Sequence, residues 1–352
     1  MKTSAVGAVH DRIVIAHGGG GELMGRLIRE HILPPLHNPH LVKLGDSAVL
    51  PWTGGDLVFT TDSYVVTPIE FPGGDIGRLA VCGTVNDLAV MGAVPLVLSL
   101  GLILEEGLPL AVLDRVLASI AATAQEAGVQ VVTGDTKVIE RRTTGDSASV
   151  AASPGLFINT AGVGRLRSGV RLGLQRVAVG DALLVTGPIA AHGLAVMSVR
   201  SGLEFDSSLR SDVAPLNGLI GAILDTGADV KFLRDATRGG VAGVLADICD
   251  ASGLSLVIDE ARVPLSVTAR HAAEMLGLDP LTVANEGCCV VVVDERDTER
   301  VVEVCREHPL GNQAAIIGHL TDSRPPLVEL ITRAGGRRVV QRPYGEDLPR
   351  IC

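Results

Sequence analysis

The chain has 352 residues, 47% of them hydrophobic, which is enough for two hydrophobic cores of ordinary domain size. Its 40 acidic residues outnumber its 30 basic residues, giving a net charge of −10, and no basic block interrupts the sequence. This balance disfavours nucleic acid and anionic membrane surfaces as partners, and it favours small molecules and proteins.

The six cysteines show no C-x-x-C pair and no zinc-ligand spacing. We expect reduced core thiols and no disulfide framework for the first five, which are Cys82, Cys249, Cys288, Cys289 and Cys305. The uncharged stretch Leu88–Leu104 holds Gly92 and Pro95, so a helix end, a turn and a buried strand fit it better than a membrane span. With no signal-peptide layout, the sequence predicts a cytoplasmic protein without a membrane segment.

Residues 12–30, RIVIAHGGGGELMGRLIRE, combine a short apolar run, four glycines and a helical pattern. The glycines are Gly18, Gly19, Gly20 and Gly21. Glycines let a backbone approach an anion closely, and a following helix N-terminus offers free N–H groups to phosphate. The segment matches neither GxxxxGK[ST] nor GxGxxG, so a phosphate cover and a plain flexible loop both remain open. Residues 31–40 predict an irregular connection.

Three acidic positions of the first half lie in or after strand-like and helical patterns. Asp46 lies in LGDSAVL, and Asp62 ends the apolar run of DLVFTTDSYVV. Asp87 follows Asn86 among the apolar residues of the helical segment GGDIGRLAVCGTVNDLAVMGAVP. Such carboxylates can supply oxygen ligands to a hard cation. Turn, N-cap and solvent-facing helical roles remain open for each of them.

The next segments predict the strand LVLSLGLIL, a helix over residues 110–127 and the strand VQVVTGDTKVIE. The last strand is expected to end at Gly134-Asp135-Thr136-Lys137, which would place another acid at a strand tip with a cation two residues later. Residues 142–154 predict a mobile loop, and FINTAGVGRL closes the first half.

The second half opens with VGDALLVTGPIAAHGLAVMSVR, a strand, a turn and a helix that suggest a duplicated α/β unit. A further helix follows residues 208–217, and VKFLRDATRGGVAGVLADIC places Asp235, Thr237 and Arg238 before an amphipathic helix. Helix capping is the open alternative to a binding role there. SLVIDEARVPL and TVANEGCCVVVV predict strands, the second with Glu286 at its entrance, and residues 312–340 predict two more.

The final segment, QRPYGEDLPRIC, has two prolines and no apolar period, so it predicts a tail. It ends in Pro349-Arg350-Ile351-Cys352. Free cysteine is normally buried, so a terminal cysteine is either incidental or is meant to reach a reaction partner. The tail alone does not decide between these.

The motifs taken together resemble a known family over residues 12–352. They are HGGGGELM, the acids Asp46, Asp62 and Asp87, GDTKVI, INTAGVG, RDATRGGVAG, NEGCCV and the terminal PRIC. The family is the HypE family of hydrogenase maturation factors, the carbamoyl dehydratases. It belongs to the ATP-binding superfamily of aminoimidazole ribonucleotide synthetase, selenophosphate synthetase and thiamine-monophosphate kinase. RDATRGG and PRIC narrow the resemblance to this family, whereas loop 142–154 looks longer than the family pattern.

The resemblance implies an α/β (α+β), two-domain PurM-like fold, each domain a mixed β-sheet backed by helices, in a homodimer formed through the first domain. The expected limits are a glycine-rich segment 1–41, domains 42–165 and 166–338, and a mobile tail 339–352. Pro349 and Arg350 are then expected to set an inward pose of the tail.

The resemblance also implies the activity. A carbamoyltransferase, HypF, loads a carbamoyl group onto Cys352, and ATP-dependent dehydration turns the thiocarboxamide into a thiocyanate. The HypC–HypD iron-assembly complex then collects cyanide for the iron of [NiFe]-hydrogenase. A small-molecule kinase or synthetase of the superfamily, or a non-catalytic thiol carrier, remains an alternative.

The site residues implied by the resemblance fall into three groups. The implied catalytic residues are Cys352, Glu286 and Lys137, with the proton acceptor open between Glu286 and Lys137. The implied Mg²⁺ ligands are Asp46, Asp62, Asp87 and Asp235. The implied ATP site comprises these four aspartates with Gly18, Gly19, Gly20, Gly21, Asp135, Thr136, Thr237 and Arg238.

Overall fold

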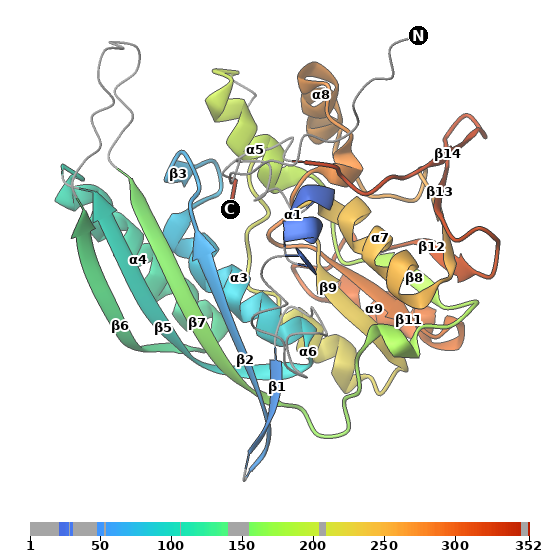
Figure 1. The fold of residues 1–352 in the computed structure, drawn as a ribbon, viewed down its shortest axis with the longest axis horizontal. Helices are drawn as coiled ribbons and strands as arrows, with labels where there is room; N and C mark the ends of the chain where they lie inside the picture. The colour runs from blue at the N-terminus through green and yellow to red at the C-terminus, as the bar shows by residue number, and fades with distance from the viewer. Residues whose placement is uncertain are drawn as a thin grey trace.

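The computed structural model describes residues 21–27, 29–30, 48–52, 54–105, 107–139, 155–203, 209–345 and 351–352. Two β-sheets with their helices lie side by side, the first on the left and the second on the right of Figure 1. The expectations for Gly18, Gly19, Gly20, Asp46, loop 142–154, Pro349 and Arg350 lie outside the described residues.

The first sheet has five strands in the order β1-β2-β7-β5-β6. Their bounds are β1 (Ala48–Trp52), β2 (Gly55–Tyr64), β7 (Leu156–Leu166), β5 (Ala93–Glu105) and β6 (Gln130–Ile139). Neighbours are antiparallel except β5 and β6, which are parallel and joined by helix α4 (Leu110–Ala127). A short ribbon of β3 (Glu70–Phe71) and β4 (Gly74–Asp75) leads into helix α3 (Ile76–Val90).

Helix α3 is the shared core of the molecule. Its N-cap is Asp75, whose Oδ1 accepts hydrogen bonds from the N–H groups of Gly77 and Arg78 at 2.7 and 2.9 Å. The helix is apolar around most of its circumference, which is typical of a helix buried on all sides. It packs against β2, β7 and α4 of the first unit and against α6 and β9 of the second. A Cβ on Gly83 would lie 2.3 Å from the hydroxyl of Tyr64, so only glycine permits this contact with β2.

The second sheet is mixed and has seven strands in the order β14-β13-β10-β12-β8-β11-β9. Their bounds are β14 (Arg337–Val339), β13 (Val328–Ile331), β10 (Ser255–Asp259), β12 (Ala315–Thr321), β8 (Ala182–Val185), β11 (Cys289–Val293) and β9 (Val230–Asp235). Its helices are α5 (Ala191–Arg200), α6 (Asn217–Asp225), α7 (Gly240–Ser252), α8 (Val267–Leu276) and α9 (Thr298–Glu307). Strands β8 and β11 are buried along their whole length.

Most expected elements are confirmed, and the first five cysteines are free and buried as predicted. The sequence did not predict α8, α9 and β14. The expected strand tip at Asp135 was wrong, because β6 continues to Ile139 through its pairing with β5. In the described part of the chain, no helix is long and apolar enough to cross a membrane.

Candidate functional site

The C-terminal cysteine is seated in the body of the protein, near β3 and α5 (Figure 1). Ile351 is 4% exposed and packs in the main core, and Cys352 beside it is half-buried. The carbonyl oxygen of Ile351 lies 2.6 Å from Nε2 of His192. An oxygen of Cys352 accepts a hydrogen bond from the N–H of Val65 at 3.4 Å, so the terminus bridges the end of β2 and the start of α5.

Arg238 is the cation that faces this terminus. The charge of Cys352 is the first cause that raises the pKa of Arg238, and the carboxylates of Asp62, Glu286 and Asp87 add to it. The residue is exposed as a whole, while burial acts to lower the pKa of its guanidinium against these charges. A guanidinium presents several N–H donors to an anion, which makes this position suited to a phosphate.

The turn that carries Arg238 depends on two glycines between β9 and α7. Gly239 and Gly240 have φ angles of 80° and 59°, and a Cβ on Gly240 would lie 2.5 Å from the carbonyl oxygen of Leu281. The N-cap of α7 is Gly239 with no side-chain hydrogen bond, so the capping interpretation of Asp235 and Thr237 was wrong.

Asp62 and Asp87 bring negative charge from the first unit. Burial raises the pKa of Asp62, while Arg238 and the N–H of Ser63 act to lower it. Asp87, within α3, accepts a hydrogen bond from the hydroxyl of Thr60 at 2.8 Å. Burial raises the pKa of Tyr64 well above its ordinary value, and the charges of Asp62 and Asp87 raise it further. The two aspartates therefore act on the same small region between β2 and α3.

Glu286 is a buried carboxyl group with a strongly raised pKa. Burial raises its pKa well above the ordinary value, Asp235, Asp212 and Asp62 raise it further, and Arg238 opposes them. Its side chain is buried, and Oε1 has no hydrogen-bond partner among the residues that the structure describes. A buried carboxyl oxygen without a partner is costly and rare in folded proteins, and such groups concentrate at functional sites.

A buried and a half-buried polar side chain, Asn285 and Asp212, hold the loop of Glu286. The Oδ1 of Asn285 accepts from the N–H of Ala190 at 2.6 Å, and its Nδ2 donates to the carbonyl of Ala236 at 2.9 Å. The carboxylate of Asp212 accepts from the N–H groups of Glu286 and Gly287 at 3.2 and 3.0 Å. Sequence reasoning gave Asp212 no functional role.

The other predicted residues lie in two further places. Gly21 lies just before α1 (Glu22–Leu27), where a Cβ would come 2.0 Å from the carbonyl oxygen of Pro343. Asp135 and Lys137 pair with each other at 2.7 Å on the exposed face of β6, which β7 and β5 separate from β2. Their roles, and that of Thr136 between them, stay predictions.

The donor set fits a hard divalent cation in chemical type. Asp62, Asp87, Asp235 and Glu286 offer oxygen atoms, and a bound cation would relieve the repulsion that raises the pKa of Glu286. Among the described residues, no group of three or more acidic, histidine or cysteine side chains lies close enough together to hold a metal ion. The fourth predicted ligand, Asp46, lies outside them.

Comparisons with known proteins identify the family. Residues 44–166 match the N-terminal domain, and residues 178–328 the C-terminal domain, of AIR synthase related protein. The chain is 44% identical to the carbamoyl dehydratase HypE of Rhizobium leguminosarum bv. viciae, over 97% of this chain and 95% of the relative.

Two solved structures are similar over nearly their whole length. One is a crystal structure of a HypE–HypF complex, with a TM-score of 0.82 and 44% identity over 90% of this chain and 99% of that chain. The other is HypE in complex with ATP, with a TM-score of 0.79 and 41% identity over 97% of this chain and 100% of that one. These matches confirm the PurM-like fold and the resemblance found in the sequence. The chain therefore belongs to the AIR synthase related proteins and, within them, to the HypE family of carbamoyl dehydratases.

Proposed function

We propose that the chain dehydrates a carbamoyl group carried on its own Cys352, at the expense of ATP, and so makes the cyanide ligand for the iron of [NiFe]-hydrogenase. The observation that carries the proposal is that Ile351 and Cys352 pack against the body of the protein beside Arg238. Cys352, Asp62, Glu286 and Asp87 all act on the same guanidinium, that of Arg238. A group attached to the thiol would therefore lie among charged residues suited to phosphoryl transfer.

The chemistry explains why ATP is needed. Direct dehydration of a thiocarboxamide would expel hydroxide, which is a very poor leaving group. Phosphorylation of the carbamoyl oxygen by ATP replaces hydroxide with phosphate, and loss of phosphate and of both nitrogen protons leaves a thiocyanate on sulfur. Arg238 would neutralise charge on the transferred phosphoryl group, because its guanidinium interacts with the charge of Cys352.

Glu286 is our candidate for the group that takes the nitrogen protons. Its raised pKa makes the ionised carboxylate a stronger base than an ordinary glutamate. Its partnerless Oε1 leaves one oxygen available for the proton. Lys137 stays the alternative acceptor, and it is held by Asp135 on β6 in this structure.

ATP and Mg²⁺ complete the proposal. A relative's structure in complex with ATP supports the nucleotide, and Gly18, Gly19, Gly20 and Gly21 would cover its phosphates. Mg²⁺ would supply charge neutralisation at the phosphates, with Asp46, Asp62, Asp87 and Asp235 as its candidate ligands, and Asp135, Thr136 and Thr237 as further contacts of the nucleotide site.

The partners follow from the same assignment. HypF would load the thiol, as the structure of a relative in a HypE–HypF complex supports, and a HypC–HypD complex would receive the cyanide. Loading and delivery both need an outward position of the tail. We place these steps in the cytoplasm, and we propose domain limits of 42–165 and 166–338, close to the two matched regions.

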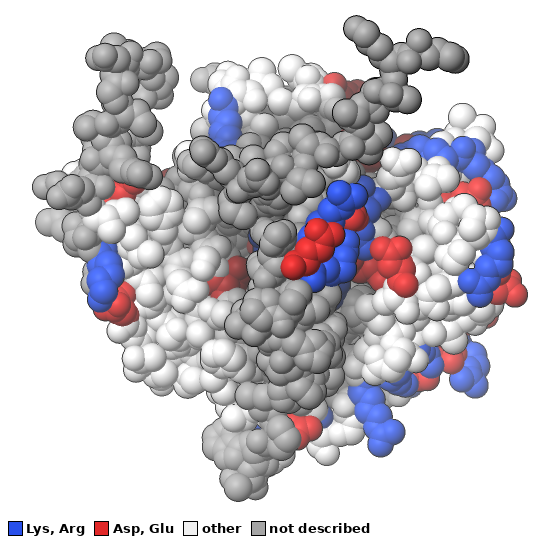
Figure 2. Space-filling model, in the orientation of Figure 1, with Lys and Arg blue, Asp and Glu red and all other residues white. Residues whose placement is uncertain are grey.

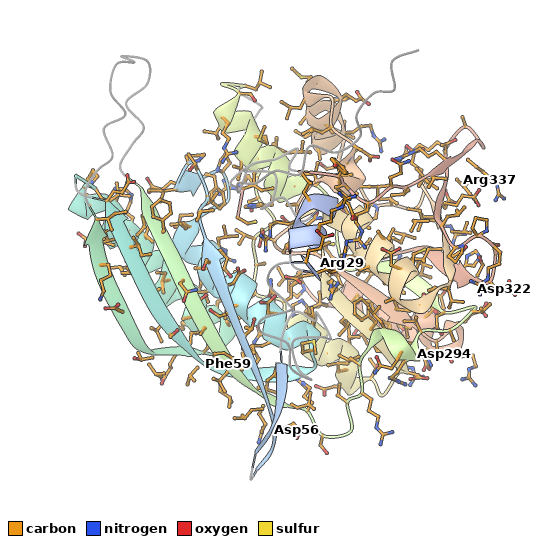
Figure 3. The ribbon with its side chains drawn as sticks, in the orientation of Figure 1. Arg29, Asp56, Phe59, Asp294, Asp322 and Arg337 are labelled. Atoms are coloured by element: carbon orange, nitrogen blue, oxygen red, sulfur yellow. The ribbon has the colours of Figure 1, made fainter. Side chains whose placement is uncertain are left out.

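A homodimer would cover the open face of the first sheet. That face exposes Phe59, Ile103 and Ile139 to 43%, 42% and 41%. Figure 2 shows few charged side chains over this sheet, and Figure 3 labels Phe59 on β2. An apolar sheet face of this kind favours burial against a second copy.

Intact mass spectrometry tests the function. The full chain is loaded with carbamoyl phosphate, HypF and ATP, and is then incubated with ATP and Mg²⁺. We expect the carbamoylated protein to lose one water, and Cys352→Ala to carry neither group. A chain that hydrolyses ATP equally well without its tail would be a small-molecule kinase or synthetase. A chain that still forms cyanide as Asp87→Asn and Glu286→Gln would be a passive carrier.

A further inference from the structure

His192 is a completely buried histidine to which the proposed chemistry gives no role. It lies in the first turn of α5, with its ring edge-on to Phe71 at a centroid distance of 5.3 Å. Burial lowers the pKa of His192 to about 4, against the opposing effect of its hydrogen bond to Ile351. The imidazole is therefore neutral at physiological pH.

A chain of hydrogen bonds fixes the tautomer of this imidazole. The N–H of Val213 donates to Oγ of Ser211 at 3.1 Å, and Oγ of Ser211 lies 2.8 Å from Nδ1 of His192. A carbonyl oxygen can only accept, so Nε2 must carry the hydrogen that is donated to Ile351. Nδ1 then accepts the hydroxyl hydrogen of Ser211.

Ile351 is held at two points at once. Its side chain packs in the main core, and its carbonyl binds the imidazole at 2.6 Å. The oxygen of Cys352 accepts a hydrogen bond from the N–H of Val65 at 3.4 Å, and the side chain of Cys352 is half-buried. The protein therefore fixes Ile351, the residue before the reactive cysteine, by its side chain and by its carbonyl group.

We propose that His192, held in its Nε2–H tautomer by Ser211, is a positioning residue that binds the carbonyl of Ile351 and keeps the tail inward. This role rests on the proposed function and adds the device that places the substrate arm. The hydrogen bond and the buried Ile351 side chain form one small contact. It can be released when the tail must leave for loading or delivery.

The same support extends to the candidate base. Asp212, next to Ser211 in the chain, accepts from the N–H groups of Glu286 and Gly287, and a hydrogen bond with the backbone of His192 acts to lower its pKa. The dipeptide Ser211-Asp212 therefore joins the imidazole that grips the tail to the loop that carries Glu286. Ser211 and Asp212 together thus position the tail relative to the carboxyl group of Glu286.

Alkylation of Cys352 tests whether His192 keeps the tail inward, and it needs neither ATP nor a partner protein. The full chain is treated with iodoacetamide, and the modified fraction is followed by intact mass, because the other five cysteines are buried. His192→Phe keeps a planar ring but removes the donor, and we expect Cys352 to react about tenfold faster. His192→Gln keeps an N–H donor and is expected to restore most of the protection. His271→Phe, on the exposed side of α8, is the matched control and should react as the unaltered chain does.

Equal alkylation rates for the unaltered chain and folded His192→Phe would overturn the proposal. If His192→Phe fails to fold, Ser211→Ala decides, since it keeps the imidazole and removes the hydroxyl that binds Nδ1 of His192 and accepts from the N–H of Val213. We expect Ser211→Ala to raise the rate about threefold, and an unchanged rate would also overturn the proposal. Loss of water from the carbamoylated chain should slow by a similar factor in His192→Phe, with unchanged dependence on ATP concentration. Failure of the unaltered chain to lose water would instead count against the dehydration.

Discussion

The side-chain oxygen of Asn86 lies 2.7 Å from the backbone nitrogen of Leu216, which ties the central helix of the first unit to the start of α6. Its Nδ2 donates to the carbonyls of Ala214 and Glu286 at 3.1 and 3.4 Å. Asn86 is 1% exposed, and every one of these partners belongs to the second unit. One buried amide therefore joins α3, which carries Asp87, to the loop that carries Glu286.

We predict that Asn86→Ala lowers the free energy of unfolding by about 2–4 kcal/mol, because it leaves buried backbone groups without partners. Urea denaturation followed by circular dichroism measures this. Asn217→Ala is the control, since Asn217 is half-buried and donates one hydrogen bond, to the carbonyl of Ala127 at 2.8 Å. Its expected loss is about 1 kcal/mol. Equal losses in the two variants would contradict the bridging role of Asn86.

Glu286→Gln should separate stability from activity. The raised pKa of Glu286 means that folding disfavours its ionised form, so at pH 8 the carboxyl group destabilises the folded state. The amide of glutamine removes this cost, and we expect the free energy of unfolding at pH 8 to rise by about 1–3 kcal/mol. Loss of water from the carbamoylated chain should fall at least about 100-fold, because an amide cannot take a proton.

Glu307→Gln, at the exposed end of α9, is the control for both measurements and should change neither. A Glu286→Gln variant that is less stable at pH 8 would contradict the electrostatic argument. One that loses water at the normal rate would exclude Glu286 as the base and leave Lys137 as the candidate.

The contact between Gly21 and Pro343 joins the glycine-rich segment to the start of the tail. The N–H of Glu22 donates to the carbonyl of Pro343 at 3.0 Å, and a Cβ on Gly21 would lie 2.0 Å from that oxygen. Gly21→Ala must displace one of the two segments, and displacements of about 1 Å cost roughly 100-fold in positioned chemistry. We expect at least about a tenfold slower loss of water. Gly54→Ala, which has open space around its Cβ, should leave the rate unchanged, and equal rates would contradict the coupling.

Sequence patterns correctly predicted the elements whose ends are set by nearby residues, such as a helix that stops at a glycine. The helix over residues 110–127 matches α4 at both ends, because its apolar period stops at Gly128, which adopts a φ of 71°. Helix α8 was missed although Ser266 caps it, accepting from the N–H of Ala269 at 3.0 Å. That cap, followed by an apolar period, was the available signal. Asp135 was misplaced because strand pairing, not the local sequence, decides where β6 ends.

The site was predicted only as far as its residues form motifs. The positions of Asp62, Asp87, Arg238 and Glu286 came from the resemblance, and the structure brings these four together around the terminus. The roles of His192 and Asp212 could not be predicted, because their partners lie 159 and 74 residues away in the chain. No local spacing encodes a contact across such distances.

Asp212 and His192, which lie near the tail, should give opposite pH dependences of the free energy of unfolding. Burial raises the pKa of Asp212 to about 6, from an ordinary value of about 3.9 in the unfolded chain. The contribution of Asp212 to the free energy of unfolding is complete below about pH 4 and is lost as the pH rises through 6. His192 has a pKa lowered to about 4 from about 6.5, so its contribution is complete above about pH 6.5 and is lost as the pH falls to 4. Each is worth about 3 kcal/mol, and between pH 4 and 6.5 they oppose each other.

A variant that lacks one of the two groups should therefore show the pH dependence of the other group alone. Relative to the unaltered chain, Asp212→Asn should lose about 3 kcal/mol of additional stability between pH 7 and 4, because only the histidine contribution remains. His192→Gln should gain a similar amount over the same range, because only the aspartate contribution remains. Urea denaturation at half-unit pH steps measures both slopes, and the difference between each variant and the unaltered chain cancels the carboxyl groups whose pKa the substitution does not change. Three parallel curves would show that neither Asp212 nor His192 has the shifted pKa on which the neutral, tail-binding imidazole depends.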